Sequence, residues 1–159
     1  MAIRNIRTDE DEILRKVSKS VDEINQRILT LIKDMAQTMY DAKGVGLAAP
    51  QVGVLKRVVV IDVGGGLFEL INPEIVKKEG EQIDIEGCLS LPGIMGDVKR
   101  PEIVVVEALD PKGEKVTIQA DGLLARALCH EIDHLDGILF KDRVIKFVDE
   151  DELRKRRKG

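Results

Sequence analysis

The chain of 159 residues is long enough for one domain with one hydrophobic core. Hydrophobic residues make up 43% of the chain and charged residues 34%, yet the two signs of charge are mixed and the formal net charge is only −4. That balance argues against a broad basic surface for DNA or RNA, and no stretch approaches the apolar length of a membrane span.

The first third of the chain is predicted to be mainly helical. A short helical stretch covers Glu10–Val17, and a longer amphipathic helix runs roughly from Asp22 to Asp41, where apolar residues recur at helical intervals. The next segment, Gly44–Val54, holds three glycines and a proline. We therefore expect a loop or an irregular edge there.

The middle of the chain is predicted to form strands. Arg57–Val63 and Leu67–Pro73 flank a turn of three glycines and indicate a hairpin of buried strands. Further strands are predicted at Glu74–Glu79, Gln82–Ile85, Glu102–Leu109 and Lys115–Ala120. Asp110–Gly113 is predicted to be the turn between the last two.

A second helix is predicted from about Asp121 to Leu135. The order of helix, hairpin-like strands and helix, without a parallel βαβ repeat, predicts an α+β fold with an antiparallel sheet. The chain ends in the basic run Arg154–Lys158. We interpret this run as the solvated end of a last helix, where positive charge complements the helix dipole; the alternative is a weak contact with nucleic acid.

The N-terminus and the cysteines indicate the compartment. The opening residues have neither an apolar core nor a small-residue cleavage site, so they are not typical of a signal peptide. Cys88 and Cys129 are far apart and do not make a disulfide framework. We therefore expect one domain spanning residues 1–159, located in the cytoplasm, with both thiols reduced.

The segment ALCHEIDHLDG carries the clearest chemical pattern. His130 and His134 are the only histidines of the chain, and their spacing places both rings on one face of the predicted helix. Glu131 follows His130 and projects beside a metal held by the two rings. This H-E-x-x-H arrangement is typical of a metal site in which the glutamate is a general base toward water.

A catalytic site of this kind needs a third protein ligand. Because no other histidine exists, the candidates are a carboxylate or a cysteine. Cys88 lies in a compact segment flanked by glycine, which could present a thiolate to the helix. Cys129 adjoins His130 and points about 100° away around the helix, so we interpret it as a small buried core residue. A set of one cysteine and two histidines suits zinc or another late first-row divalent ion.

Three segments together resemble peptide deformylase: GVGLAAPQ (Gly44–Gln51), EGCLS (Glu86–Ser90) and HEIDH (His130–His134). They match the three motifs of that family in order and spacing, and the flanking sequence fits over nearly the whole chain. The resemblance implies antiparallel sheets packed around a central metal-binding helix that carries HExxH, with a long N-terminal helix and a short C-terminal helix.

The resemblance also implies the metal ligands and the base. By it, Cys88, His130 and His134 hold one divalent metal ion, and Glu131 is the general base and later the general acid. Iron(II) is the metal that it favours, and zinc, nickel or cobalt can occupy the same site. The implied reaction is removal of the N-formyl group from the formyl-methionine of new polypeptides, with release of formate by an amide hydrolase.

Further residues are matched to the substrate. The resemblance implies that the Gln51 side-chain amide and the Leu89 backbone N–H face the developing oxyanion. Gly46, with its neighbour Val45, would let the substrate backbone pass close to the first motif, where a larger side chain would obstruct it.

A methionine side chain needs an apolar pocket beside the helix. Val45, Leu123 and Ala127 are candidates for its walls, and ordinary core packing is the alternative for all three. Arg126 lies either at the pocket rim or in solvent. Asp133 is either an orienting partner of the metal site or part of a structural ion pair. The family often has glutamine where this chain has Cys129, and a second thiol there could add sensitivity to oxidation.

The expected partners are N-formylmethionyl peptides and nascent chains, with no DNA and no membrane. The protein is expected to be a monomer, and the basic C-terminus could make a transient contact with the ribosome. Two other interpretations are a general HExxH metallopeptidase and a metal site that only stabilises the fold. The first usually uses a later histidine or glutamate, and the second normally has four protein ligands. Neither explains GVGLAAPQ.

Overall fold

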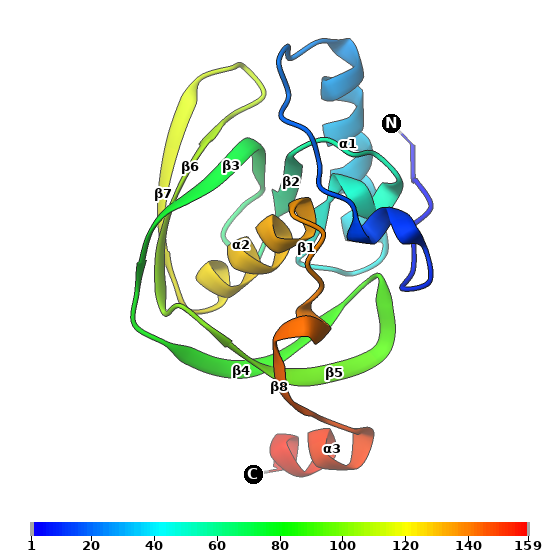
Figure 1. Ribbon diagram of the computed structural model, residues 1–159, viewed down its shortest axis with the longest axis vertical. Helices are drawn as coiled ribbons and strands as arrows, with labels where there is room; N and C mark the ends of the chain where they lie inside the picture. The colour runs from blue at the N-terminus through cyan, green and yellow to red at the C-terminus, as the bar shows by residue number, and fades with distance from the viewer. Residues whose placement is uncertain (1, 159) are drawn as a thin grey trace.

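The computed structural model describes residues 2–158 (Figure 1). Its α-helices are α1 (Gln26–Asp41), α2 (Gly122–Leu135) and α3 (Glu150–Lys158), and its short 3₁₀ helices are η1 (Glu12–Arg15), η2 (Ala49–Val52) and η3 (Phe140–Arg143). Its strands are β1 (Gly46–Ala48), β2 (Val58–Ile61), β3 (Phe68–Glu79), β4 (Gln82–Cys88), β5 (Leu91–Arg100), β6 (Ile103–Leu109), β7 (Lys115–Asp121) and β8 (Val144–Phe147).

The strands form two sheets in which the named strands pair only antiparallel. One sheet has the order β1-β2-β3-β6-β7, and the other has the order β4-β5-β8. Helix α2 lies at the centre of the molecule and contacts strands of both sheets (Figure 1). The predicted α+β class with antiparallel sheets is therefore confirmed.

Strand β2 shows why the core has two halves. All four of its residues are buried, and successive side chains point to opposite faces. Val59 and Ile61 join the apolar cluster under α2, whereas Val58 and Val60 join the cluster under α1. The five-stranded sheet is thus covered by a helix on each face, and its near-continuous apolar sequence reflects burial on both sides.

Helix α1 begins later than its apolar pattern predicted. Asn25 has an extended backbone, and its side chain accepts a hydrogen bond from Ile28 N at 3.1 Å, which caps the helix at Gln26 rather than at Asp22. The helical stretch predicted at Glu10–Val17 is only the single 3₁₀ turn η1. Leu14 of that turn is fully buried, so this segment is held by packing and not by helix length.

The strand predictions need correction in two respects. The two strands predicted on either side of Pro73 are one strand, β3, because a register shift between Ile71 and Glu74 places the proline in a bulge. Strands β5 and β8 were not predicted at all. Gly96 of β5 faces Val144 of β8 so closely that a Cβ there would lie 2.6 Å from Val144 Cγ1. The glycine that weakened the strand pattern is what allows β8 to approach.

The segment predicted as a loop or an irregular edge, Gly44–Val54, is largely buried and includes the edge strand of the five-stranded sheet. It contains strand β1 and the 3₁₀ helix η2, which is followed by Gly53 in the left-handed region at φ 85°. Every residue of Gly46–Val52 is buried. This places the side chain of Gln51 inside the molecule, beside the turn of the hairpin β4–β5.

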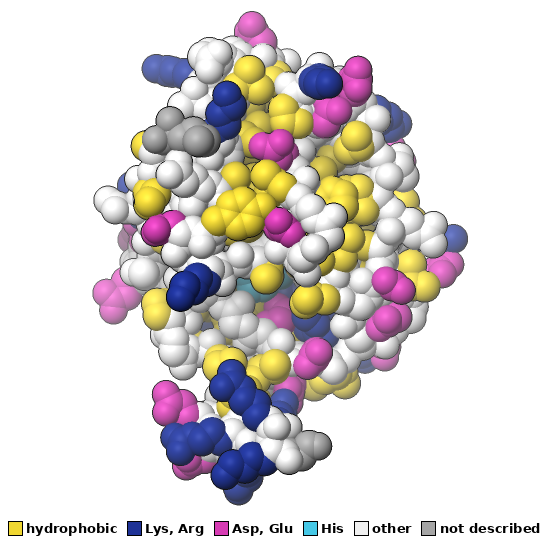
Figure 2. Space-filling model, turned by 180° about the vertical axis from the view of Figure 1, so that it is seen from behind, with side chains coloured by type: hydrophobic (Ala, Val, Ile, Leu, Met, Phe, Trp, Pro, Cys, Tyr) yellow, Lys and Arg dark blue, Asp and Glu magenta, His cyan; other side chains and the backbone are white. Residues whose placement is uncertain are grey.

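The C-terminal helix α3 projects from the body below β8 (Figure 1). It has no buried residue, and Arg156 ties it to the sheet through two bonds to Asp97 at 2.7 and 2.9 Å. Lysine and arginine side chains gather on it in the space-filling view (Figure 2). Among the helices of residues 2–158, none is long and apolar enough to cross a membrane.

Candidate metal centre

Helix α2 supplies three of the predicted site residues. His130 and His134 lie one turn apart with ring centroids separated by 5.2 Å, and both are buried. The helix can place them there because its opposite face is apolar and packs on the five-stranded sheet. Histidine atoms are visible at the floor of a hollow in Figure 2.

The structure brings Cys88 to the two histidines. Cys88 ends strand β4, and its Sγ lies 3.3 Å from His134 Nε2. One ligand atom from each of the three residues lies within 4.8 Å of the other two. Cys129 instead packs in the apolar cluster under α2, where burial raises the pKa of its thiol. Of the two cysteines, only Cys88 belongs to the group.

This donor set fits a divalent metal. Two imidazole nitrogens and one sulfur are the ligands that late first-row ions prefer, and three protein ligands leave a position for substrate. Burial lowers the pKa of His134 well below its usual range, with a further contribution from His130, so the ring is neutral and can offer a lone pair. The Nδ1 atom of His134 has no hydrogen-bond partner, which leaves Nε2 as its interacting atom on the Cys88 side.

A cavity of about 380 Å³ lies against this group. The residues lining it come from the segment around β1, from β4 and its turn, and from α2: Lys43, Gly44, Val45, Gly46, Gln51, Ile85, Glu86, Gly87, Cys88, Leu89, Leu123, Arg126, Ala127, His130 and Glu131. Val45 and Leu123 are about half exposed at its mouth (47% and 57%), and Ala127 is a buried part of its wall. Val45 and Leu123 are therefore accessible from the cavity and are not core residues, whereas Ala127 both lines the cavity and belongs to the apolar cluster under α2.

Glu131 is buried beside the same cavity, and one of its oxygens has no partner to compensate for its removal from water. Its Oε2 lies 4.0 Å from His130 Nε2, and its Oε1 has no hydrogen-bond partner. Burial raises the pKa of Glu131 to about 7, and the charge of His130 only partly opposes this shift. A carboxyl group whose pKa lies near neutrality can both take up and return a proton.

Glycine at position 46 is required by the position of this carboxylate. A Cβ built on Gly46 would lie 2.9 Å from Glu131 Cδ and 3.0 Å from its Cγ, and closer still to Oε2. The first motif therefore approaches the general-base candidate too closely for any side chain. The passage of the substrate backbone at Gly46 stays a prediction, and the neighbour found at this position is a residue of the protein itself.

The sequence did not reveal the carboxylate that orients His130. Glu86 Oε1 lies 2.9 Å from His130 Nδ1, which fixes the ring with Nε2 toward Cys88 and His134. Arg100 donates to both oxygens of Glu86 at 2.9 Å, and Arg126 also bonds to it. Glu86 and Cys88 both reach the two histidines from the end of β4, although the strand pairing shifts register between them, so the alternation of a regular strand could not have predicted this pair.

The charges of this buried cluster are well matched. Burial by itself raises the pKa of Glu86, but the hydrogen bonds from Arg100 and His130 outweigh it and hold that pKa well below its usual range. Arg100 also bonds Asp133 at 2.7 Å, and Arg143 bonds Asp133 at 2.6 Å. Asp133 therefore forms a structural ion pair that also reaches the metal site through Arg100.

The structure decides between the two predictions for Arg126, the pocket rim and the solvent. It is only 4% exposed, so a solvated Arg126 is wrong. It lines the cavity while its guanidinium is bound to Glu86. The same side chain thus forms cavity wall and ion network.

Gln51 enters the site from the other side. Its Oε1 accepts a hydrogen bond from Ala48 N at 2.9 Å. Its Nε2 donates to Ser90 Oγ at 3.0 Å and lies 3.6 Å from Cys88 Sγ. Leu89 follows Cys88 in the turn between β4 and β5 and also lines the cavity. The amide therefore lies beside the group that the three ligand residues form.

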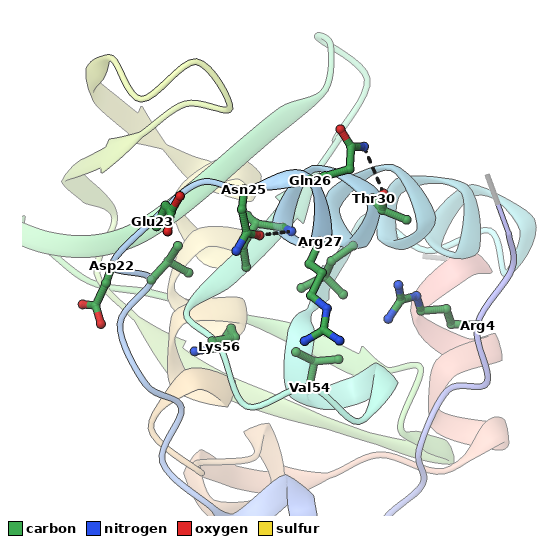
Figure 3. Close-up of a pocket in the computed structure, with 12 residues that line it drawn as sticks. Arg4, Asp22, Glu23, Asn25, Gln26, Arg27, Thr30, Val54 and Lys56 are labelled. Carbon is green, nitrogen blue, oxygen red and sulfur yellow. Dashed lines mark hydrogen bonds between the residues drawn. The ribbon is translucent and has the colours of Figure 1, made fainter.

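A larger cavity of about 670 Å³ lies elsewhere, along the start of α1 (Figure 3). Its lining mixes charged and apolar residues: Arg4, Val21, Asp22, Glu23, Asn25, Gln26, Arg27, Ile28, Thr30, Leu31, Val54 and Lys56. It contains none of the histidines or cysteines of the chain. Size alone would favour this cavity, but the reactive groups are gathered in the smaller one.

The comparisons with known proteins point to one family. Residues 3–150 match the family model described as polypeptide deformylase. A peptide deformylase of Acetivibrio thermocellus is 73% identical over 159 residues, which are all of this chain and 94% of that protein. One of Caldicellulosiruptor bescii is 62% identical over 157 residues, which are 99% of this chain and 95% of that protein.

Solved structures that superpose on this chain are also peptide deformylases. The crystal structure of a peptide deformylase from Legionella pneumophila superposes with a TM-score of 0.87 at 47% identity, covering 98% of this chain and 92% of that one. A peptide deformylase from Synechococcus elongatus in complex with actinonin gives a TM-score of 0.86 at 44% identity, covering 96% of this chain and 82% of that one.

Proposed function

The chain belongs to the polypeptide deformylase family, whose members remove the N-formyl group from newly made polypeptides, and we propose that the cavity beside Cys88, His130 and His134 is where it does so. The observation that carries the proposal is the buried carboxylate of Glu131, whose Oε1 has no hydrogen-bond partner, next to three metal-ligand atoms within 4.8 Å of one another. Residues 1–159 act as one catalytic domain, in which α2 is the central metal-binding helix, α1 the long N-terminal helix and α3 the short C-terminal one.

Cys88, His130 and His134 would hold one divalent metal ion. When bound, such an ion supplies Lewis acidity that polarises the formyl oxygen and makes water easier to deprotonate. We favour iron(II), with zinc, nickel or cobalt as replacements. A purely structural metal site would use a fourth protein ligand, and within residues 2–158 the group contains three.

Glu131 is the proton carrier of the proposed reaction. Its free Oε1 accepts a proton from the attacking water, and the same group returns the proton to the departing amine nitrogen. A pKa raised by burial serves the second step, because a more basic carboxylate holds the proton until the amine takes it. The carboxylate is held in place by its own burial and by contact with Gly46.

Two N–H groups receive the charge that develops on the formyl oxygen. Gln51 and Leu89 both line the cavity. The Gln51 amide lies near Cys88 Sγ, and Leu89 follows Cys88 in the chain. Preorganised donors of this kind stabilise an oxyanion more than they stabilise the ground-state carbonyl.

The first side chain of the substrate fits the apolar part of the cavity. Val45 and Leu123 at its mouth and Ala127 in its wall suit an unbranched apolar side chain such as methionine. Gly46 leaves room for the substrate backbone. Arg126 contributes its aliphatic stem to the wall, because its guanidinium is already bound to Glu86.

The test is formate release from an N-formyl-methionyl peptide. The protein is prepared without oxygen and loaded separately with iron(II), nickel, cobalt or zinc. Release with at least one metal, and none from the acetylated peptide, supports the proposal. Folded, metal-loaded protein that releases no formate with any of the four ions contradicts it. The cytoplasm, where formylated chains are made, is the proposed place of action, and a monomer by light scattering is the expected state.

Gly46→Ala is expected to lower the rate of formate release by about 100-fold, because its methyl group must displace the Glu131 carboxylate by an appreciable fraction of an ångström. The matched control is Gly65→Ala. Gly65 has no atom within 4 Å of a built Cβ and is not in the left-handed region, so this variant should retain the wild-type rate. An active Gly46→Ala enzyme would show that Glu131 has another productive position.

The basic helix α3 is proposed to make a transient contact with the ribosome. It is exposed along its whole length and carries Arg154, Lys155, Arg156, Arg157 and Lys158, which suit a phosphate-rich surface (Figure 2). Deleting residues 151–159 is expected to reduce co-sedimentation with ribosomes at low salt and to leave formate release unchanged. Equal co-sedimentation of the full and shortened chains would contradict the contact.

A further inference from the structure

The orientation of the Gln51 amide depends on few partners. An amide group has one acceptor end and one donor end, and rotation about its last bond is soft. Ala48 N binds the Oε1 end at 2.9 Å. The Nε2 end carries two N–H groups in the plane of the amide. One further partner is needed to fix that plane, so that one N–H faces the cavity.

Ser90 is that partner, and it is itself firmly held. Its side chain is fully buried, and its Oγ accepts from Gln51 Nε2 at 3.0 Å. Its backbone oxygen accepts from Asp9 N at 2.9 Å, while Lys141 Nζ bonds both oxygens of Asp9 at 2.7 and 2.8 Å. The position of Ser90 therefore does not depend on Gln51.

The N-terminal segment also holds the backbone of Gln51. Arg7 N donates to Gln51 O at 2.7 Å, two residues before Asp9 N donates to Ser90 O. The carbonyl groups of Gln51 and Ser90 thus both accept hydrogen bonds from one short segment, which we call the Arg7–Asp9 clip. It fixes the distance between Gln51 and Ser90 from outside the site, and their side chains meet inside it.

We propose that Ser90 is a positioning residue for the reaction: it engages one N–H of Gln51 so that the other N–H faces Cys88 and the formyl oxygen of the substrate. The proposal rests on the deformylase function proposed above. The second N–H lies on the Cys88 side, since Nε2 is 3.6 Å from Cys88 Sγ. Without Ser90 Oγ, the Gln51 amide keeps its Ala48 contact and only the long, weak contact of Nε2 with Cys88 Sγ, and it can rotate away from the cavity.

A double-mutant cycle separates this role from a general effect on packing. Gln51→Ala is expected to lower kcat by about 100- to 1,000-fold, as for loss of one oxyanion donor. Ser90→Ala is expected to lower kcat by roughly 10-fold with KM changed less than about twofold, a fraction of that donor effect. In the Gln51→Ala background, Ser90→Ala should lower kcat no further. Effects that multiply instead would overturn the proposal.

A second measurement works without any catalysis. The side-chain amide signals of Gln51 in a ¹⁵N–¹H NMR spectrum are identified by their absence in Gln51→Ala. In the wild type they should exchange slowly with water, and in Ser90→Ala they should shift and exchange faster. Unchanged signals in Ser90→Ala would overturn the proposal about Ser90. This measurement does not need formate release, so the proposal about Ser90 and the proposed deformylase function can fail independently.

Ser18→Ala is the matched control. Ser18 is also a buried serine, but its Oγ has no hydrogen-bond partner within residues 2–158, so its loss should leave kcat and the Gln51 signals as in the wild type. If thermal melting shows that Ser90→Ala does not fold, Ser90→Cys replaces it. A thiol is a weaker acceptor, so its kcat should lie between those of wild type and Gln51→Ala, and its Gln51 amide signals should exchange faster than in the wild type. Wild-type values for Ser90→Cys would count against the proposal.

Discussion

Replacing Glu131 by Gln is expected to lower kcat for formate release by at least about 100- to 10,000-fold while the metal content stays the same. The amide is nearly the same size as the carboxylate but cannot take a proton from water. The ligands Cys88, His130 and His134 are untouched. Metal content by elemental analysis and formate release on the same sample check both parts of the expectation.

The same variant should be more stable than the wild type when both are free of metal. Because burial raises the pKa of Glu131 from 4.5 to about 7, its ionised form destabilises the fold, and this cost grows as the pH rises from 4.5 through 7. Glutamine never ionises, so its advantage in thermal melting should be present at pH 8 and absent at pH 4. Glu74→Gln, at an exposed position, is the control and should change neither rate nor melting. A Glu131→Gln enzyme with wild-type kcat would exclude Glu131 as the base.

Arg100→Met is expected to cause the largest loss of stability, about 3–5 kcal/mol. Arg100 is buried and donates to Glu86 and Asp133 together. Methionine fills part of the space but leaves the buried carboxylate of Glu86 and the partly buried one of Asp133 with fewer partners. For a protein of this size the melting temperature should fall by about 2–4 °C for each kcal/mol. Thermal denaturation at pH 7 measures this directly.

Arg156→Met provides the comparison for Arg100→Met. Arg156 also makes a two-bond contact with a carboxylate, Asp97, but it lies at the surface, where such a pair contributes little to stability. The two variants remove the same charge from different depths. Equal losses of stability would mean that burial of the Glu86 cluster does not set the importance of Arg100.

Local patterns in the sequence predicted the parts of the fold that depend on local interactions. The hairpin from β2 to β3 and the helix α2 follow from glycine turns, alternating apolar residues and helical spacing. The HEIDH pattern placed His130 and His134 on one helix face for the same reason. The choice of Cys88 as the third residue needed the family resemblance, and the structure brings it to the two rings.

Contacts between distant segments were not predictable in the same way. Strand β5 contains Pro92, Gly93 and Gly96, so its sequence is not typical of a strand, and only its pairing with β4 and β8 makes it one. The bonds from Glu86 to Arg100 and Arg126 join residues 14 and 40 apart. No spacing rule relates such positions, because the fold alone brings them together.

The Arg7–Asp9 clip makes the first and last parts of the chain depend on each other. Asp9 and Lys141 are 132 residues apart, and Arg15 and Asp142, which also form an ion pair, are 127 apart. Contacts of such high sequence separation carry a large loop-closure entropy, so we expect them to form after the local hairpins. The amide protons of Arg7 and Asp9 should therefore exchange with solvent in one cooperative opening that also frees Gln51 and Ser90. Hydrogen exchange at these two amides would report, from outside the cavity, how often the catalytic geometry is lost.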